Sequence, residues 1–317
     1  MKIKVLDADT LGADLDLSPL YPLGEVSVYG GTSKDELGGR LADAEVILLN
    51  KIKIDDSALS MAPSLRLICV LATGYDNIDL SACRAHGVAV CNVRGYSTDS
   101  VAQVTLSMAL SLATHLAEYR QSVDSGAYTS GGVANRLTPV YHELAGKCWG
   151  VIGYGGIGKK VAAVAEAIGC RVLACRKNPA PNDNTVSLDT LLREADIISV
   201  HTPLNESTRG LIDAEAIRKM KDGVIFINVA RGAVTDEAVI ADAVVSGKIG
   251  ALGVDVYTAE PMPKEHPFWA ILGRPNVCLT PHMAWGAYEA RVRCLAESIA
   301  NIEAFYSGKR RNRVDGE

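Results

Sequence analysis

Three charged side chains in the last third of the 317-residue chain have the types and spacing needed for proton transfer and anion binding. Arg231, Glu260 and His282 each follow an apolar run typical of a strand. The carboxyl ends of parallel strands lie at one edge of a sheet, so we expect the three side chains to lie near one another. A carboxylate beside an imidazole raises the imidazole pKa and holds its orientation, which makes His282 a usable general acid. Arg231 could hold a carboxylate, although a surface salt bridge is an alternative for it.

These groups suit hydride transfer to a carbonyl. Negative charge develops on the carbonyl oxygen, and a proton donor and a guanidinium both stabilise it. A lone histidine is more often structural, and we expect a structural role for His86, His115, His142 and His266.

A glycine-rich turn predicts a dinucleotide site. Gly153-Tyr154-Gly155-Gly156-Ile157-Gly158 follows the apolar residues 150–152 and precedes a helical stretch at 159–168. In a GxGxxG turn the glycines allow a tight turn, a close approach to pyrophosphate and close helix–strand packing, and helix N–H groups face the anion. A glycine-rich turn without a ligand is the alternative.

The next strand ends in a cation pair where NAD-binding proteins carry an acidic residue. Arg176 could form a bidentate bond to a 2′-phosphate, and Lys177 adds a second positive charge. We therefore expect NADP(H) to be preferred, with NAD(H) possible. Two solvated charges after a strand are the simpler interpretation.

Two series of alternating strands and helices position these groups. The first series predicts strands at 3–7, 25–29, 46–49, 67–71 and 88–92, with helices at 34–44 and 79–86. A long helix is expected over 100–122. The second series predicts strands at 148–152, 171–175, 197–201, 224–228, 251–256 and 277–280, and a final helix covers 288–306. We expect an α/β protein with two doubly wound parallel sheets.

Composition argues against several classes of protein. The net charge of −5 weighs against nonspecific binding to nucleic acid or an anionic membrane. The first residues lack the long apolar core of a signal peptide. No apolar run is close to the length of about 18 residues that a membrane-spanning helix needs. The eight cysteines include no CxxC pair, so we expect buried thiols and no metal site. We expect a cytoplasmic location.

The order of the motifs resembles the D-isomer-specific 2-hydroxyacid dehydrogenase family over nearly the whole chain. The motifs are Ala72-Thr73-Gly74-Tyr75-Asp76-Asn77-Ile78-Asp79, Ser100-Val101-Ala102, the GxGxxG turn, His201-Thr202-Pro203-Leu204, the Arg231 segment, Asp255 with Glu260-Pro261, and Pro281-His282. Within the family the chain is most similar to glycerate dehydrogenases, also called hydroxypyruvate reductases. This similarity lies in Asn50-Lys51, in the Ala72 to Tyr75 loop, and in His282 followed by Ala284-Trp285 and Glu289-Ala290-Arg291.

The resemblance implies reduction of a small 2-oxo acid, hydroxypyruvate or glyoxylate, by hydride transfer from NAD(P)H. It implies that His282 is the proton donor, that Glu260 pairs with it, and that Arg231 binds the substrate. Backbone amides at Thr73 and Gly74 would receive the substrate carboxylate. Lys51 and Tyr75 would shape the pocket. Cofactor contacts are expected at Val101, Gly153, Gly155, Gly156, Ile157, Gly158, Arg176, Lys177, Thr202, Ala230 and Asp255, the last holding the nicotinamide carboxamide.

The resemblance also implies a domain arrangement. Residues 1–98 with 287–317 would form a flavodoxin-like substrate domain, and residues 99–286 a Rossmann cofactor domain inserted into it. The long helix and the segment after it would contribute to a homodimer.

Two residues depart from the family pattern, and other functions remain open. Gln103 stands where Glu is common, which alters only a packing contact. Arg176 replaces the acidic residue of NAD users. An NAD(H)-sensing binding protein of the transcriptional corepressor type shares this fold, and a related dehydrogenase could take a different 2-oxo acid. Glu260 argues against a formate dehydrogenase-like enzyme, because that family carries Gln beside its catalytic histidine.

Overall fold

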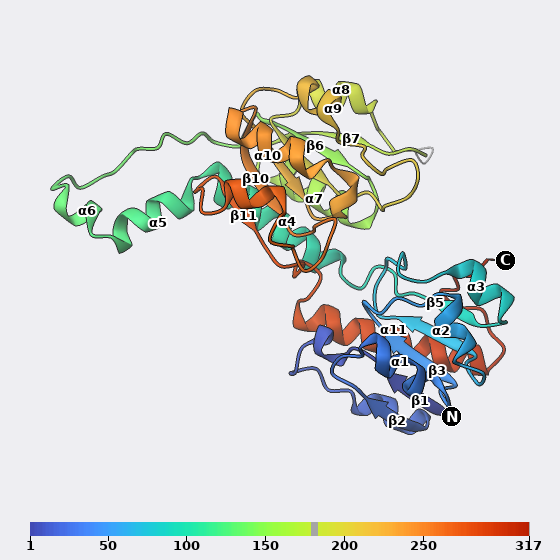
Figure 1. Ribbon diagram of the computed structural model, residues 1–317. Helices are drawn as coiled ribbons and strands as arrows, with labels where there is room; N and C mark the ends of the chain where they lie inside the picture. The colour runs from blue at the N-terminus through green and yellow to red at the C-terminus, as the bar shows by residue number, and fades with distance from the viewer. Residues whose placement is uncertain (179–182, 317) are drawn as a thin grey trace. The chain divides into compact units, whose positions relative to one another are not determined.

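The computed structural model describes residues 1–178 and 183–316. The chain separates into two compact units, Met1–Ser97 with Gly286–Glu317, and Thr98–Trp285 (Figure 1). We call these the first and second units and describe each by itself. The roles of substrate domain and cofactor domain remain predictions.

The first unit contains a parallel sheet of five strands in the order β2-β1-β3-β4-β5. Every residue of β3 and β4 is buried, as expected for parallel strands covered on both faces. The order is that of flavodoxin, in which the winding reverses between the first and third strands. The strands are β1 Lys2–Val5, β2 Glu25–Val28, β3 Val46–Leu49, β4 Leu67–Val70 and β5 Ala89–Cys91.

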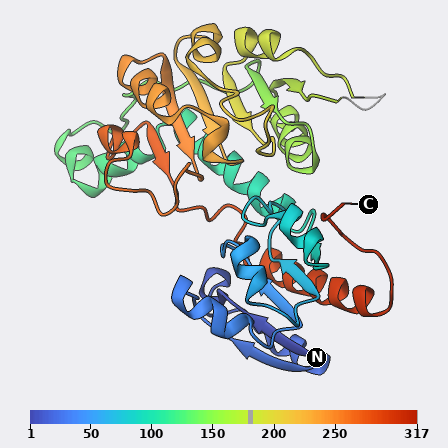
Figure 2. The ribbon, with the colours of Figure 1, turned by 45° about the vertical axis from the view of Figure 1, so that its right-hand side comes forward.

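The helices of the first unit come from both ends of the chain. Asp55 and Asp79 cap two of the short helices by accepting hydrogen bonds from backbone amides. The C-terminal helix α11 lies beside β4 in this unit (Figure 2), and the Asn301 amide donates to the carbonyl of Asn92 at the end of β5, 3.0 Å apart. The helices are η1 Ala8–Leu11, η2 Ser18–Leu23, α1 Lys34–Leu41, α2 Asp56–Ser60, α3 Leu80–Ala85 and α11 Tyr288–Tyr306.

The second unit contains a parallel sheet of six strands in the order β11-β10-β9-β8-β6-β7. Thr185 forms a parallel bridge with Ala174 on the side of β7 that does not face β6, so this residue takes the place of a short third strand. The chain order thus becomes the Rossmann order 3-2-1-4-5-6 with one strand added. The strands are β6 Cys148–Ile152, β7 Arg171–Cys175, β8 Ile197–Val200, β9 Val224–Asn228, β10 Ile249–Val254 and β11 Val277–Leu279.

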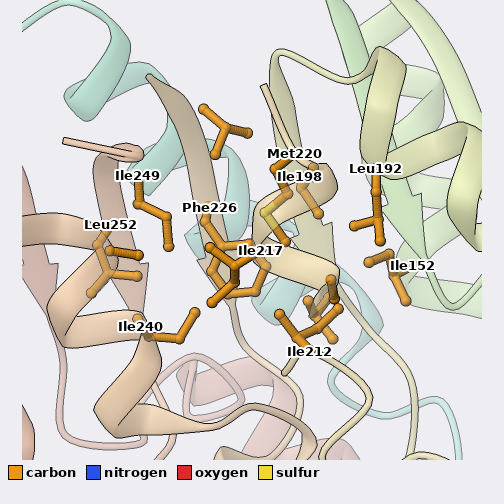
Figure 3. Packing of buried hydrophobic residues seen from close by; sticks show 14 of the residues in the cluster. Ile152, Leu192, Ile198, Ile212, Ile217, Met220, Phe226, Ile240, Ile249 and Leu252 are labelled. Carbon is orange, nitrogen blue, oxygen red and sulfur yellow. The ribbon is translucent and has the colours of Figure 1, made fainter. Parts of the chain in front are cut away.

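Apolar clusters cover both faces of this sheet. Successive residues of a strand point to opposite faces, so neighbouring residues belong to different clusters. Phe226 packs in a cluster with Ile198, Ile217 and Ile240 on one face (Figure 3), and its neighbour Ile227 belongs to the cluster on the other face. The two sheets confirm the predicted α/β class with two doubly wound units. The helices are α4 Thr98–Ala113, α5 Leu116–Asp124, α6 Ala127–Ser130, α7 Gly156–Ala167, α8 Leu188–Glu194, α9 Ala214–Lys219, η3 Gly232–Val234, α10 Glu237–Ser246 and η4 Pro267–Ile271.

The prediction of one continuous helix over 100–122 is wrong. The chain breaks between α4 and α5, and the two helix axes differ by 65°. His115 has φ 52°, in the left-handed region, which ends the helical hydrogen bonding of α4. In the part of the chain described, no single helix is long and apolar enough to span a membrane, although the bent pair α4 and α5 together meets that length and composition.

Candidate active site

The polar side chains of the second unit follow its strands in spatial order. From one edge of the sheet inward, His282 follows β11, Glu260 follows β10 and Arg231 follows β9. His201-Thr202 follow β8 and the glycine-rich turn follows β6. All these strands are parallel, so the five segments leave the same edge of the sheet. Ligands of open α/β sheets bind at this edge.

His282 and Glu260 form a close pair. The imidazole Nδ1 lies 2.6 Å from Glu260 Oε2, and the backbone amide of Tyr257 donates to Glu260 Oε1 at 3.1 Å. The two side chains are 19% and 26% exposed, so the pair is shielded but accessible. With Nδ1 donating to the carboxylate, Nε2 is the nitrogen available for proton transfer. His282 has φ 55°, a strained conformation for a residue other than glycine and one that is common at functional sites.

Asp255 shapes the loop that carries His282. Its Oδ1 accepts from the Thr280 hydroxyl at 2.5 Å and from the Met283 amide at 2.8 Å, and its Oδ2 accepts from the Ala284 amide at 2.9 Å. Burial raises the pKa of Asp255, and these hydrogen bonds act in the opposite direction. The carboxylate therefore fixes the chain on both sides of His282. Its predicted contact with a nicotinamide carboxamide stays a prediction.

The Arg231 segment is held by a buried amide. The Asn228 side chain accepts from the Ala230 amide at 3.0 Å and donates to the Arg231 carbonyl at 3.0 Å. The guanidinium itself donates to the Ala230 carbonyl at 2.8 Å. Arg231 is half-buried, which keeps the cation close to the sheet edge.

The glycine-rich turn has the shape that a dinucleotide requires. Gly153 has φ 98°, and a Cβ there would lie 2.6 Å from the His201 carbonyl carbon. A Cβ at Gly158 would lie 2.1 Å from the Gly153 oxygen, so helix α7 and its strand touch closely. Gly155 faces open space and leaves the α7 N-terminus without a side-chain cap. These residues fit a pyrophosphate, which helix N–H groups would bind.

The positively charged side chains near the end of β7 form ion pairs with a carboxylate, that of Asp183. Arg176 lies 2.7 Å from Asp183 and 3.4 Å from the Tyr154 carbonyl oxygen, and Lys159 lies 2.9 Å from the other Asp183 oxygen. Lys177 is exposed. Sequence reasoning did not find Asp183, because the chain between it and Lys177 has no regular pattern.

The remaining predicted cofactor residues lie along the same sheet. Thr202 and Ala230 follow β8 and β9, and Val101 packs with Ile157 in the cluster beneath α4 and α7. Beside Thr202, burial lowers the pKa of His201 to about 3, so this imidazole stays neutral and is no candidate acid. Within residues 1–178 and 183–316, no group of three or more His, Cys, Asp or Glu side chains could hold a metal ion.

The predicted substrate residues of the first unit follow β3 and β4. Asp7, after β1, accepts from the amides of Asn50, Lys51 and Ile52 at 2.9, 2.6 and 3.3 Å. This carboxylate therefore fixes the loop that presents Lys51, and sequence reasoning missed its role.

The loop after β4 is fixed by the end of β5. Asn92 donates to the Thr73 carbonyl at 2.7 Å, and the Thr73 hydroxyl donates to the Val93 carbonyl at 2.8 Å. In a trans peptide the N–H points opposite to the C=O, so the Gly74 amide faces away from Asn92. Thr73 and Tyr75 are exposed, and Gly74 is partly so. The sequence did not single out Asp7 or Asn92, because each ends a predicted strand and its hydrogen bonds join segments far apart in the chain.

The Rossmann strand order, the glycine-rich turn and the imidazole–carboxylate pair at the same sheet edge define a dinucleotide-dependent oxidoreductase. A family model described as "D-isomer specific 2-hydroxyacid dehydrogenase, NAD binding domain" matches residues 106–284. The chain therefore belongs to the D-isomer-specific 2-hydroxyacid dehydrogenase family.

Individual relatives agree with this assignment. The chain is 38% identical to a hydroxypyruvate reductase of Blautia hydrogenotrophica, over 99% of this chain and 100% of the relative. It is 37% identical to a glycerate dehydrogenase of Methylorubrum extorquens, over 92% of each. The structure of D-lactate dehydrogenase from Aquifex aeolicus complexed with NAD and lactic acid matches with a TM-score of 0.88 at 28% identity, covering 100% of both chains.

Proposed function

We propose that the protein reduces a small 2-oxo acid, hydroxypyruvate or glyoxylate, to the D-2-hydroxy acid with NAD(P)H. The observation that carries the proposal is the contact between His282 Nδ1 and Glu260 Oε2, which are 2.6 Å apart. Both residues follow strands that end at the same sheet edge as Arg231 and the glycine-rich turn. The names of the relatives at 37 and 38% identity support this substrate class.

A nicotinamide bound at the glycine-rich turn would supply hydride for C2 of the substrate, while the side chains stabilise the developing charge and transfer the proton. The protonated His282 donates its Nε2 proton to the carbonyl oxygen as negative charge develops there. Glu260 stabilises the imidazolium and holds its ring. Arg231 binds the substrate carboxylate and carbonyl side.

A substrate panel tests this function. Initial rates are measured for hydroxypyruvate, glyoxylate and pyruvate, each with NADPH and with NADH. We expect turnover of hydroxypyruvate or glyoxylate and formation of the D product. Tight binding of NAD(P)H with turnover of none of the three acids would contradict the proposal and favour a nucleotide-sensing binding protein.

We further propose that NADP(H) is preferred over NAD(H). Arg176, Lys177 and Lys159 carry three positive charges near the end of β7, and Asp183 cancels one of them. The remaining positive charge favours a 2′-phosphate, because hydrogen bonds between ionised groups are about twice as strong as neutral ones.

Replacing the arginine tests the preference. Arg176→Asp should reverse a wild-type preference for NADPH, with a loss of about 10- to 100-fold in NADPH affinity. Arg171→Asp, at the opposite end of the same strand, is the matched control and should leave the preference unchanged. Fluorescence titration of both cofactors measures it, and a wild type that binds NADH more tightly would contradict the proposal.

We also propose a homodimer formed through α5 and the segment after it. Figure 1 shows α5 and α6 extending away from the sheet of the second unit, and large apolar side chains are exposed along this part of the chain. Large exposed apolar side chains gathered along one segment favour an association site there. The exposed residues are Leu116, Val123, Tyr128, Val133, Leu137, Val140 and Tyr141.

Light scattering tests the dimer. The wild type should have twice the mass of one chain, and Leu137→Asp combined with Val140→Asp should give a folded monomer. Met283→Asp, which places a charge at another exposed apolar residue outside this segment, serves as a control for folding. A monomeric wild type at micromolar concentration would contradict the proposal.

A further inference from the structure

A second imidazole–carboxylate pair lies behind the loop that carries Glu260. His266 Nε2 is 2.9 Å from Glu237 Oε2, and the two side chains are 4% and 10% exposed. The Phe268 amide donates to His266 Nδ1 at 3.2 Å. Because Nδ1 accepts, Nε2 carries the proton and donates to Glu237. The pair is therefore buried and has a defined direction.

Glu237 is bonded directly to the Glu260 loop. Its Oε1 accepts from the Thr258 amide at 2.8 Å, and the preceding amide, that of Tyr257, donates to Glu260 Oε1 at 3.1 Å. Two consecutive amides are thus held by two carboxylates, one buried and one beside His282. Releasing the first bond frees the Tyr257–Thr258 peptide, which is joined through the Tyr257 Cα to the peptide that makes the second bond.

The same peptide contacts the Arg231 and His282 segments. A Cβ at Gly232 would lie 2.1 Å from the Tyr257 carbonyl carbon and 2.2 Å from the Thr258 nitrogen, so the chain next to Arg231 packs against this peptide. The Tyr257 hydroxyl donates to the Thr280 carbonyl at 3.0 Å, two residues before His282. The Tyr257 ring also lies edge-on to His266, with centroids 5.7 Å apart.

We propose that Glu237 and His266 are positioning residues for the site, which hold the Tyr257–Thr258 peptide and, through the adjoining Tyr257 amide, the carboxylate of Glu260 against His282. The proposal rests on the proposed function for its kinetic consequence, but its geometric claim can be measured without turnover. Neither side chain is expected to touch substrate or cofactor.

Several titratable groups surround the His282 imidazole, and they define the readout. Glu260 contacts it directly, Asp255 interacts with it electrostatically, and Arg231 leaves the neighbouring strand end. Burial and the nearby carboxylates raise the pKa of Tyr257 to about 12, so this hydroxyl stays neutral while His282 titrates. His266→Asn leaves every carboxylate in place, so a change in the His282 titration in that variant reports on Glu260. In Glu237→Gln, the combination with Glu260→Gln separates this effect from the direct loss of a charge.

Two substitutions separate the bonds. Gln at Glu237 can accept from the Thr258 amide or face His266, but it cannot accept from both donors. Asn at His266 keeps an acceptor for the Phe268 amide and is too short to reach Glu237. His266→Asn therefore removes the bond to Glu237 and is the second variant if Glu237→Gln fails to fold.

The experiment is an NMR titration of the His282 imidazole in the full chain, assigned with His282→Ala. Glu260→Gln removes the carboxylate beside His282 altogether, so the decrease in the His282 pKa in this variant is the largest that we expect. We expect Glu237→Gln and His266→Asn to lower it in the same direction, and either substitution combined with Glu260→Gln to lower it no further. An unchanged His282 pKa in folded Glu237→Gln and His266→Asn, beside a lowered one in Glu260→Gln, would overturn the proposal.

Kinetics give the second readout. Because about 1 Å of misplacement can cost 100-fold, we expect kcat with the best 2-oxo acid to fall about 10- to 100-fold in Glu237→Gln, with cofactor affinity unchanged. Asp213→Ala removes the N-cap of α9 and is the control for destabilisation alone; kcat should be retained. Failure of the proposed function would appear as a wild type without turnover, whereas failure of this proposal appears as an unmoved titration.

Discussion

The Glu260 carboxylate has a different partner on each oxygen, the His282 imidazole on one and the Tyr257 amide on the other. A negative charge 2.6 Å from the imidazole favours its protonated form. The reduction needs that form, because the imidazolium supplies the proton. The rate of reduction should therefore fall at alkaline pH, where the imidazole has lost that proton.

Glu260→Gln removes the charge and keeps the size. The imidazolium then loses the carboxylate that stabilises it, so the alkaline limb of kcat/KM for the 2-oxo acid should move to lower pH, with a rate loss of about 100-fold at neutral pH. Rates across about pH 5.5 to 9 measure the limb. Glu303→Gln, an exposed glutamate on α11, should leave the profile unchanged. An unmoved limb in Glu260→Gln would show that this carboxylate does not govern the proton donor.

At the scale of elements, the periodic segments could be predicted and the links between them could not. Both doubly wound sheets and the three strand ends with Arg231, Glu260 and His282 follow from apolar runs and their polar boundaries. The break at His115 is a single left-handed residue inside a helical pattern, which apolar spacing does not register. The loop supports of Asp7, Asn92 and Glu237 depend on long-range hydrogen bonds that no local pattern contains.

Two glycines of the β6–α7 turn should respond differently to the same substitution. Gly153→Ala meets the His201 backbone at a φ of 98°, so we expect loss of more than about 1 kcal/mol of unfolding free energy. Gly155→Ala enters open space, so the fold should keep its stability while dinucleotide affinity falls. Thermal unfolding and fluorescence titration measure the two effects. Unchanged cofactor affinity in Gly155→Ala would contradict the placement of the pyrophosphate.

At the scale of the whole molecule, the buried His201 makes the free energy of unfolding depend on pH. Its pKa is about 3 in the folded protein because of burial, against about 6.5 in an unfolded chain. As pH falls below about 6.5, the imidazole therefore becomes protonated in the unfolded chain but stays neutral in the folded protein, which lowers the free energy of unfolding. The stabilising contribution is complete above that pH and is lost progressively toward pH 3.

Denaturant unfolding of wild type and His201→Gln tests this coupling. The wild type should lose about 2 kcal/mol more than the variant between about pH 6.5 and 5, since one proton corresponds to about 1.4 kcal/mol per pH unit. The other five histidines are the same in both proteins and cancel in the comparison. Equal pH slopes in the two proteins would contradict this prediction, because they would show that His201 binds its proton equally in the folded and unfolded states.

We propose that His282 supplies the proton during reduction of a 2-oxo acid. Stopped-flow measurement of the hydride-transfer rate in wild type and His282→Gln tests this role directly. Cofactor dissociation constants are determined for both proteins in the same experiment. We expect the wild type to reduce hydroxypyruvate or glyoxylate, and the variant to transfer hydride about 100- to 10,000-fold more slowly at unchanged cofactor affinity. A variant rate within about twofold of wild type would contradict it.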